Sequence, residues 1–396
     1  MYKSAFYGIY CREVIALKRG FVTFLLCAVA AAAFFSAVSA GKKNEEVIVD
    51  YSYVLVESET GAVLAENNGR QPRSAGYLNK LMTLLLIAED IETGKFRLTD
   101  ELTASESVLG TKGSVVWLQP GDKMTVEELL KSVIIGNAND AVTVLAEASE
   151  QTLDKFVMRM NTRAFDLGLR CTSFYSPYGY DNEQEITTAA DMAVICSELS
   201  KYEQLTPYFK MWRDFVKDGT VELVSENQLT RTYPQHIGFK ASHSELSGYC
   251  AAECGKSENG TKYISVVLGA PDAETAQNKA KELCRKGFSE YKVTGTMFPD
   301  EMLLPIKVRN GRDIAVPIRL RSQSSVVVPR VAGDLRTVTV LPKFVTAPVK
   351  NGQVIGTAAF FNGKTLVYES DIITDGSVSP LDYSYIFREM LLNIVE

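Results

Sequence analysis

Tyr77 and Lys80 are the residues of this chain whose types and spacing most directly suggest chemistry. They lie three positions apart at the start of a mostly apolar segment, residues 81–88, and Gly94 ends the helix that this segment predicts. A lysine amine one helical turn from a hydroxyl can help to deprotonate it and so prepare a nucleophile. A phenol, however, titrates at about pH 10 and carries its oxygen far from the backbone.

Two further segments place polar residues among apolar ones. Asn137 and Asn139 precede a second predicted helix, and their amides can hydrogen-bond a substrate; alternatively, Asn139 or Asp140 simply caps that helix. Lys240 lies on a predicted strand, in the sequence Gly-Phe-Lys-Ala-Ser. Taken alone, Lys240 would be read as a surface lysine on an edge strand.

Together, these segments resemble three motifs of the D-alanyl-D-alanine carboxypeptidases, the low-molecular-mass penicillin-binding proteins of peptidase family S11. In the Ser-x-x-Lys motif, Lys80 matches the lysine, and Tyr77 stands where the nucleophilic serine belongs. In the Ser-x-Asn motif, Asn139 matches the asparagine and Asn137 replaces the serine. An amide cannot relay a proton as a hydroxyl can, so both catalytic motifs are degenerate.

The third motif of the family, Lys-Thr-Gly, resembles Lys240, Ala241 and Ser242. Lys240 keeps its place. Ala241 and Ser242 occupy the substrate-binding positions, where Ala241 lacks the hydroxyl that would hold a terminal carboxylate. Ser242 adds bulk where glycine lets the substrate backbone approach.

Similar segments continue between and after the motifs. Residues 156–169, 176–181 and 187–193 resemble stretches that these enzymes carry in the same order, so the resemblance covers roughly residues 50–290. Residues 347–356 are similar to part of the C-terminal β-domain of the same carboxypeptidases. The resemblance implies an α/β fold, a serine β-lactamase/transpeptidase-like sandwich of antiparallel sheet and helices, followed by a small all-β C-terminal domain.

The three motifs occur in the order found in the family, but each contains substituted residues, and two functions are compatible with this combination. In the first, the chain is a catalytically inactive carboxypeptidase homologue of the cell envelope that binds peptidoglycan stem peptides or scaffolds a protein partner. In the second, it remains an active D-Ala-D-Ala carboxypeptidase in peptidoglycan maturation, with Ser74 or a Tyr77 phenolate as an unorthodox nucleophile. We favour the first, because loss of a nucleophile normally costs many orders of magnitude in rate.

The first 40 residues predict export. A basic start, an apolar run over residues 21–35 and a small-residue site ending at Ala40 are typical of a secretory signal peptide, with an uncleaved anchor as the alternative. Its removal takes away four basic residues and one acidic residue, so the formal net charge falls from −6 to −9. This charge argues against nucleic-acid binding, and we expect an extracytoplasmic location at a bacterial membrane or cell wall.

The remaining inventory excludes other chemistries. Only two histidines, His236 and His243, are present, without a His-Glu-x-x-His pattern, so a zinc peptidase or a Ser-His-Asp triad is disfavoured. No phosphate-cradling glycine loop occurs, and we expect no metal or cofactor. The five cysteines after the leader are not a disulfide scaffold, and Cys250 and Cys254 are predicted to be buried on one face of a strand.

Local patterns predict the elements that position these residues. A hairpin is predicted around residues 59–61, a capping box at residues 125–128 ahead of a helix, and a second hairpin through Asn259-Gly260. Asp272 is predicted to cap a helix whose inward stripe contains Ala276, Ala280 and Leu283. Strands early and late in the sequence, with helices between them, predict a sandwich whose last strands border the site.

After residue 295, short alternating segments predict the β-domain, with Ile314, Val316, Ile318 and Leu320 on one face and a hairpin at Asn362-Gly363. The predicted organisation is therefore a signal peptide (1–40), a carboxypeptidase-like domain (45–292), a β-domain (295–380) and an amphipathic tail helix (381–396). The tail has one arginine against two glutamates, so we expect weak or no membrane association, with docking on the β-domain as the alternative.

Overall fold

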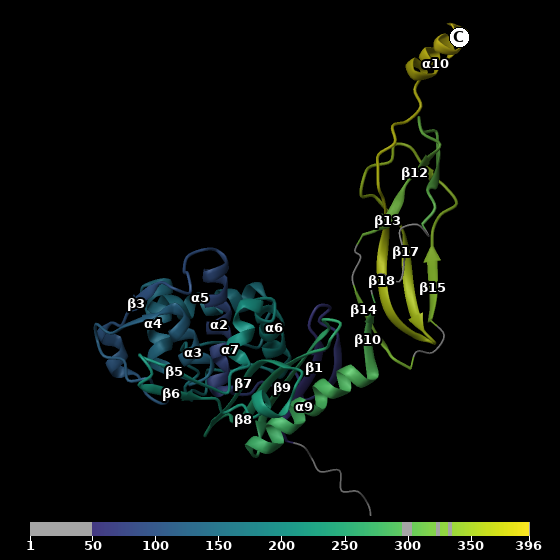
Figure 1. The fold of residues 1–396 in the computed structure, drawn as a ribbon. Coiled ribbons are helices and arrows are strands. Elements are labelled where there is room, and N and C mark those ends of the chain that lie inside the picture. The colour runs from purple at the N-terminus through teal and green to yellow at the C-terminus, as the bar shows by residue number, and fades with distance from the viewer. Residues whose placement is uncertain (1–49, 295–302, 322–324, 332–334, 396) are drawn as a thin grey trace, which may run out of the picture. The chain divides into compact units, whose positions relative to one another are not determined.

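The computed structural model describes residues 50–294, 303–321, 325–331 and 335–395 (Figure 1). The predicted signal peptide lies outside the described residues. The strands of the first part of the chain are β1 (Ser52–Glu57), β2 (Val63–Asn67), β3 (Glu101–Thr103), β4 (Lys123–Thr125), β5 (Arg213–Val216), β6 (Val221–Val224), β7 (His236–Ser244), β8 (Gly248–Lys256), β9 (Lys262–Ala270) and β10 (Tyr291–Thr294). Its α-helices are α2 (Lys80–Glu92), α3 (Val126–Ile134), α4 (Asn139–Glu150), α5 (Leu153–Asp166), α6 (Ala189–Leu199), α7 (Thr206–Phe209), α8 (Leu229–Thr232) and α9 (Ala273–Glu290).

A five-stranded antiparallel sheet of order β2-β1-β9-β8-β7 forms the centre of this part. The hairpins β1–β2 and β8–β9 are the two that the sequence predicts. Strand β1 also pairs with β9, with Val54 opposite Val266, so the beginning of the domain is joined to its end. Strand β7, which carries Lys240, is an edge strand of the sheet.

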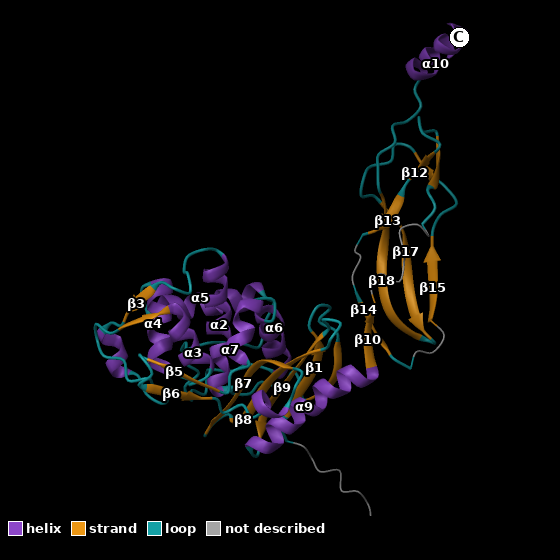
Figure 2. Cartoon of the chain, in the orientation of Figure 1, coloured by secondary structure: helices purple, strands orange, loops and turns teal. Residues whose placement is uncertain are grey.

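Helices cover both faces of the sheet (Figure 2). Helix α2 is apolar on nearly all sides, and Leu81, Leu84 and Leu85 have no exposed surface, as expected for a central buried helix. On the opposite face, α9 packs its predicted stripe of Ala276, Ala280 and Leu283 against the sheet. The predicted capping box at Thr125 and Glu128 is present, and Asp272 caps α9 by accepting the N–H of Thr275.

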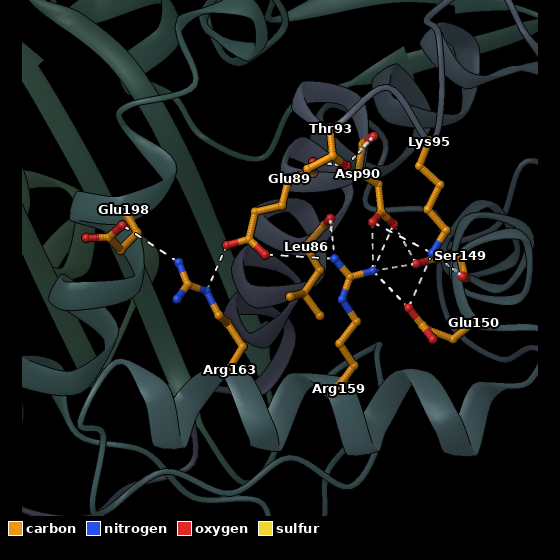
Figure 3. A network of polar contacts seen from close by, with 10 residues as sticks. All are labelled: Leu86, Glu89, Asp90, Thr93, Lys95, Ser149, Glu150, Arg159, Arg163 and Glu198. Carbon is orange, nitrogen blue, oxygen red and sulfur yellow. Dashed lines mark hydrogen bonds and ion pairs between the residues drawn. The ribbon is translucent and has the colours of Figure 1, made fainter.

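An ion-pair network fixes α2 relative to its neighbours (Figure 3). Arg159 on α5 lies 2.8 Å from the carboxylate of Asp90, which is only 3% exposed and also accepts the hydroxyl of Ser149 on α4. Arg163, one turn later, pairs with Glu89 on α2. A buried carboxylate is tolerated when its oxygens are paired in this way, so the network holds α2 in one position relative to α4 and α5.

The C-terminal part of the chain is a β-domain followed by a helix. Its elements are β11 (Ile306–Arg309), β12 (Ala315–Val316), β13 (Ile318–Leu320), β14 (Val326–Pro329), β15 (Leu335–Val340), β16 (Val345–Thr346), β17 (Val354–Asn362), β18 (Thr365–Thr374) and α10 (Tyr383–Val395). The predicted hairpin after Asn362 joins β17 to β18. Val316, Ile318 and Leu320 are buried as predicted, but Ile314 is 87% exposed. The prediction for Ile314 is wrong because strand β12 begins only after it.

The predicted tail segment forms α10, on which Phe387 and Met390 are 66% and 60% exposed. Within the described ranges, no helix combines the length and apolar character that crossing a membrane requires. The fold is therefore the predicted mixed α/β sandwich with an antiparallel sheet, followed by a C-terminal β-domain. Cys250 and Cys254 are buried as predicted.

Candidate active site

The first motif lies where a short 3-10 helix, η1 (Gly76–Asn79), runs into α2. The amine of Lys80 lies 4.3 Å from the centroid of the Tyr77 ring, so it faces the ring. Burial, followed by the nearby carboxylates of Asp181 and Glu226, raises the pKa of Tyr77. The phenol therefore holds its proton more tightly than a free tyrosine does, which is the opposite of what a nucleophile requires.

Lys80 has no exposed surface, and its Nζ finds no hydrogen-bond partner among the described residues. Burial, followed by the positive charge of Lys240, lowers the pKa of Lys80 well below its ordinary value. A lowered pKa favours the neutral amine, which is the form that can accept a proton. The site thus contains an amine suited to act as a base, with an aromatic ring above it.

The hydroxyl of Tyr77 extends toward the loop between Thr111 and Leu118. A Cβ added at Gly113 would lie 3.4 Å from the Tyr77 hydroxyl oxygen and 2.9 Å from the side-chain nitrogen of Asn139. The phenol therefore spans the space between the first and second motif segments. A side chain the size of serine could not reach this loop.

The second motif segment forms the turn from α3 into α4. Asn137 has a left-handed backbone with φ of 56°, and Asn139 begins α4 and donates to the carbonyl of Lys112 at 2.6 Å. The residue before α4 is Ala138, without any side-chain cap, so the alternative in which Asn139 or Asp140 caps the helix is wrong. The buried carboxylate of Asp140 instead accepts backbone N–H groups of the loop at residues 116 and 118.

Lys240 on β7 is buried, with 4% of its surface exposed. Its ammonium donates to the carbonyl oxygens of Val133 and Ile134, at the C-terminal end of α3, over 2.8 and 2.9 Å. Burial lowers the pKa of Lys240 to about 8, while the carboxylate of Glu226 acts in the opposite direction. Carbonyls at a helix C-terminus carry partial negative charge and stabilise the cation, so the surface-lysine alternative is wrong.

Ala241 and Ser242 follow Lys240 on β7. Ser242 is 3% exposed, and its hydroxyl has no partner among the described residues. Ala241 and Ser242 also line a pocket of about 240 Å³ together with Glu226 and residues of α9. Ser74, the alternative nucleophile, accepts the N–H of Gly76 at 3.3 Å ahead of η1.

Two residues of the site were missed by the sequence analysis. Gly179, with φ of 79°, lies against η1, where an added Cβ would overlap the carbonyl of Gly76. Glu185 is 2% exposed and accepts the side-chain N–H of Asn79 at 3.0 Å. Both lie in or near segments noted for their resemblance to the family, but only the fold places them beside Tyr77 and Lys80.

Glu185→Gln is expected to stabilise the protein above pH 7 and to have little effect at pH 4. Burial raises the pKa of Glu185 from 4.5 to about 7, so the folded state binds this proton more tightly than the unfolded state. Stability of the wild type therefore falls as pH rises from about 4.5 to about 7, a penalty of about 3 kcal/mol that glutamine avoids. Urea unfolding across this pH range measures the difference. The exposed Glu183→Gln serves as control, and an equal effect of both variants at pH 8 would contradict the assignment.

Comparisons with known proteins identify the family of this chain. The family model described as D-alanyl-D-alanine carboxypeptidase matches residues 39–272, and that of the penicillin-binding protein 5 C-terminal domain matches residues 295–379. The chain is 30% identical over 338 residues to D-alanyl-D-alanine carboxypeptidase DacF of Bacillus subtilis, covering 84% of this chain and 87% of that protein. It is 29% identical over 330 residues to DacC of Escherichia coli, covering 80% and 81%.

Solved structures share the fold. Penicillin binding protein 5 from Haemophilus influenzae superimposes with a TM-score of 0.76 at 24% identity, covering 83% of this chain and 97% of that one. The carboxypeptidase DacD from Francisella tularensis gives a TM-score of 0.71 at 22% identity, covering 86% and 96%. Since the family model spans more than half of the sequence, this chain belongs to the D-alanyl-D-alanine carboxypeptidase family, peptidase family S11.

Proposed function

We propose that this protein is a non-catalytic member of its family that retains a cleft for peptidoglycan stem peptides and acts by binding or scaffolding in the cell envelope. The observation that carries the proposal is the ring of Tyr77 lying over the amine of Lys80. A nucleophile must be small enough to attack and must lose its proton easily. Tyr77 fails on both counts, because its ring occupies the position and its pKa is raised.

The other altered positions support the same conclusion. Asn137 offers an amide in place of a proton-relaying hydroxyl, and Ala241 offers no hydroxyl at all. Groups that hold a ligand without reacting with it remain: the amide of Asn139, which begins α4, and the buried ammonium of Lys240. Selection on binding would keep such groups, whereas selection on turnover would keep the serine.

The proposed location is the extracytoplasmic face of a bacterial membrane or the cell wall, after export by residues 1–40. Support comes from the signal-like sequence and from relatives named as D-alanyl-D-alanine carboxypeptidases. The proposed occupants of the cleft and its surroundings are a stem peptide and a protein partner of the envelope.

The test is covalent labelling with a fluorescent penicillin, followed by a denaturing gel and intact-mass spectrometry. We expect no adduct, because the acyl-enzyme ester needs the hydroxyl that Tyr77 replaces. The Bacillus subtilis relative DacF is the positive control for labelling, and calorimetric titration with a D-Ala-D-Ala stem pentapeptide measures binding separately.

A labelled band that disappears in Ser74→Ala or Tyr77→Phe would establish the active carboxypeptidase instead. Saturable binding of the pentapeptide that weakens in Lys240→Met, without any hydrolysis product, would support the proposal that the protein binds stem peptides without cleaving them. Absence of both labelling and peptide binding would leave scaffolding of a protein partner as the surviving form of the proposal.

A further inference from the structure

Both tryptophans of this chain are exposed, although tryptophan is usually among the more buried residue types. Trp117 is 67% exposed and Trp212 is 42% exposed, and Phe215 on β5 is 47% exposed. All three lie in two segments: the loop before β4 and the β5–β6 hairpin with its preceding residue. We propose that these rings form a binding surface for the glycan of the polymer whose stem peptide enters the cleft, an inference that rests on the proposed function.

The backbone holds Trp117 outward. Asp140 is 1% exposed, and its carboxylate accepts the N–H groups of Val116 and Leu118, on either side of the tryptophan, all at 3.0 Å. The side chains of Val116 and Leu118 are buried, while Trp117 takes a left-handed φ of 55° that is rare for a bulky residue. A conformation this unfavourable persists only where the surroundings impose it, and such positions concentrate at functional sites.

The surface is continuous from Trp117 to the hairpin. Lys217, just after β5, donates to the carbonyl of Trp117 at 3.1 Å and pairs with Asp122 at 3.0 Å. Phe215 lies on β5, two residues before Lys217 in the chain. The guanidinium of Arg213 lies 5.2 Å from the centroid of the Phe215 ring.

Arginines also hold the second tryptophan. The guanidinium of Arg231 lies 5.2 Å from the centroid of Trp212, and that of Arg213 lies 6.0 Å from it. Cation–π contacts of this kind fix the orientation of an exposed ring, so less rotamer freedom is lost when a ligand binds. We call Trp117, Phe215 and Trp212, with these arginines, the aromatic surface.

The aromatic surface borders the second motif segment. Strand β6 packs against the second motif segment, since a Cβ added at Gly136 would lie 2.7 Å from Leu223 Cδ2. The loop of Trp117 also contacts that segment, where the backbone N–H of Asn139 donates to the carbonyl of Ser114 at 2.7 Å. A polymer whose peptide branch enters the cleft would therefore pass its main chain over these two neighbouring segments.

The chemistry of the surface suits a chain of N-acetylated pyranose rings. Apolar C–H faces of sugar rings pack on aromatic faces, while guanidinium and ammonium groups donate to ring substituents and acetamido carbonyls. The rings of the aromatic surface are distributed over the loop before β4 and the β5–β6 hairpin, so successive sugars of a repeating polymer could each contact a different ring. Arg213 lies beside both Phe215 and Trp212, and Arg231 lies beside Trp212, so two of the three rings have a guanidinium next to them.

Intrinsic fluorescence gives a direct test, because the only two tryptophans of the sequence both belong to the aromatic surface. Titration of the full-length protein with N-acetylglucosamine hexamer, and with peptide-free glycan strands, is expected to change tryptophan emission saturably. The D-Ala-D-Ala pentapeptide without sugar is expected to leave the emission nearly unchanged. Calorimetry on Trp117→Ala and Trp212→Ala is expected to show binding of the glycan at least about fivefold weaker in each.

Conservative and remote variants provide the controls. Trp117→Phe and Trp212→Phe should retain most of the binding, since they keep a ring, and Met158→Ala, an exposed apolar residue on α5, should bind as the wild type does. Unchanged emission with both glycans, or equal binding by the alanine variants, would overturn the proposal, as would a response to the pentapeptide alone. These outcomes are independent of penicillin labelling, so failure here is distinguishable from failure of the non-catalytic assignment.

Discussion

Tyr77→Ser alone is expected to leave the rate of acylation by penicillin near background. A quadruple variant that also carries Asn137→Ser, Ala241→Thr and Ser242→Gly is expected to be acylated at least about 10³-fold faster than the wild type. Loss of a catalytic serine nucleophile costs about 10⁶ in rate, so its return has room for an effect of this size. The Tyr77→Ser variant gains a hydroxyl beside Lys80. It still lacks the hydroxyl at position 137 that relays a proton and the hydroxyl at position 241 that binds the terminal carboxylate of the substrate.

The physical basis is that these residues act as a unit. Lys80 already has a lowered pKa and no hydrogen-bond partner among the described residues, so the base is in place. Ser242 is buried beside Lys240, so glycine at this position would open the strand to a substrate backbone. Effects of residues that cooperate in one step are strongly non-additive, and partial restoration is therefore expected to recover little.

A time course of labelling with a fluorescent penicillin, quenched at intervals and quantified on denaturing gels, measures the acylation rate of each variant. The same four substitutions combined with Lys80→Met provide the control, and this variant should be unreactive. Robust labelling of Tyr77→Ser by itself would show that the other positions matter little. If the quadruple variant without Lys80→Met also fails to react with the fluorescent penicillin, further parts of the site have diverged.

Gly179→Ala is expected to destabilise the protein by about 2–5 kcal/mol, the largest stability effect that we predict. Gly179 has φ of 79°, which costs any other L-residue about 1–2 kcal/mol. An added Cβ would also overlap the carbonyl of Gly76 and lie 3.1 Å from the Cα of Tyr77. Because both obstacles are backbone atoms, η1 must shift, and overpacking of this kind costs about 1–3 kcal/mol more.

Gly121→Ala is the matched control, since Gly121 has φ of 90° but an added Cβ there would have no neighbour within 4 Å. Gly121→Ala is expected to lower the free energy of unfolding only by the cost of a left-handed backbone at alanine, about 1–2 kcal/mol. Urea denaturation followed by tryptophan fluorescence measures both variants, because both tryptophans belong to this domain. Equal destabilisation by the two substitutions would contradict a specific contact between Gly179 and η1.

Much of the fold follows from local sequence patterns. The capping box at Thr125, the cap at Asp272 and the Asn259-Gly260 turn each depend on residues within a few positions of one another, and the structure confirms all three. Where a pattern was extended by one residue, at Ile314, the prediction failed. Alternation gives the face of a residue within a strand, but it does not determine where the strand begins.

The sequence by itself determined which side chains stand at the three motif positions, and therefore that no serine occupies the place of the nucleophile. Only the tertiary structure decided how these side chains meet. The ring of Tyr77 lies over Lys80, Lys240 binds the carbonyls at the end of α3, and Glu185 is buried. The hydrogen bonds of Lys240 and Glu185 join residues 106 or 107 positions apart, and the altered pKa values follow from the removal of water from charged groups. Local periodicity records neither long-range contacts nor loss of hydration.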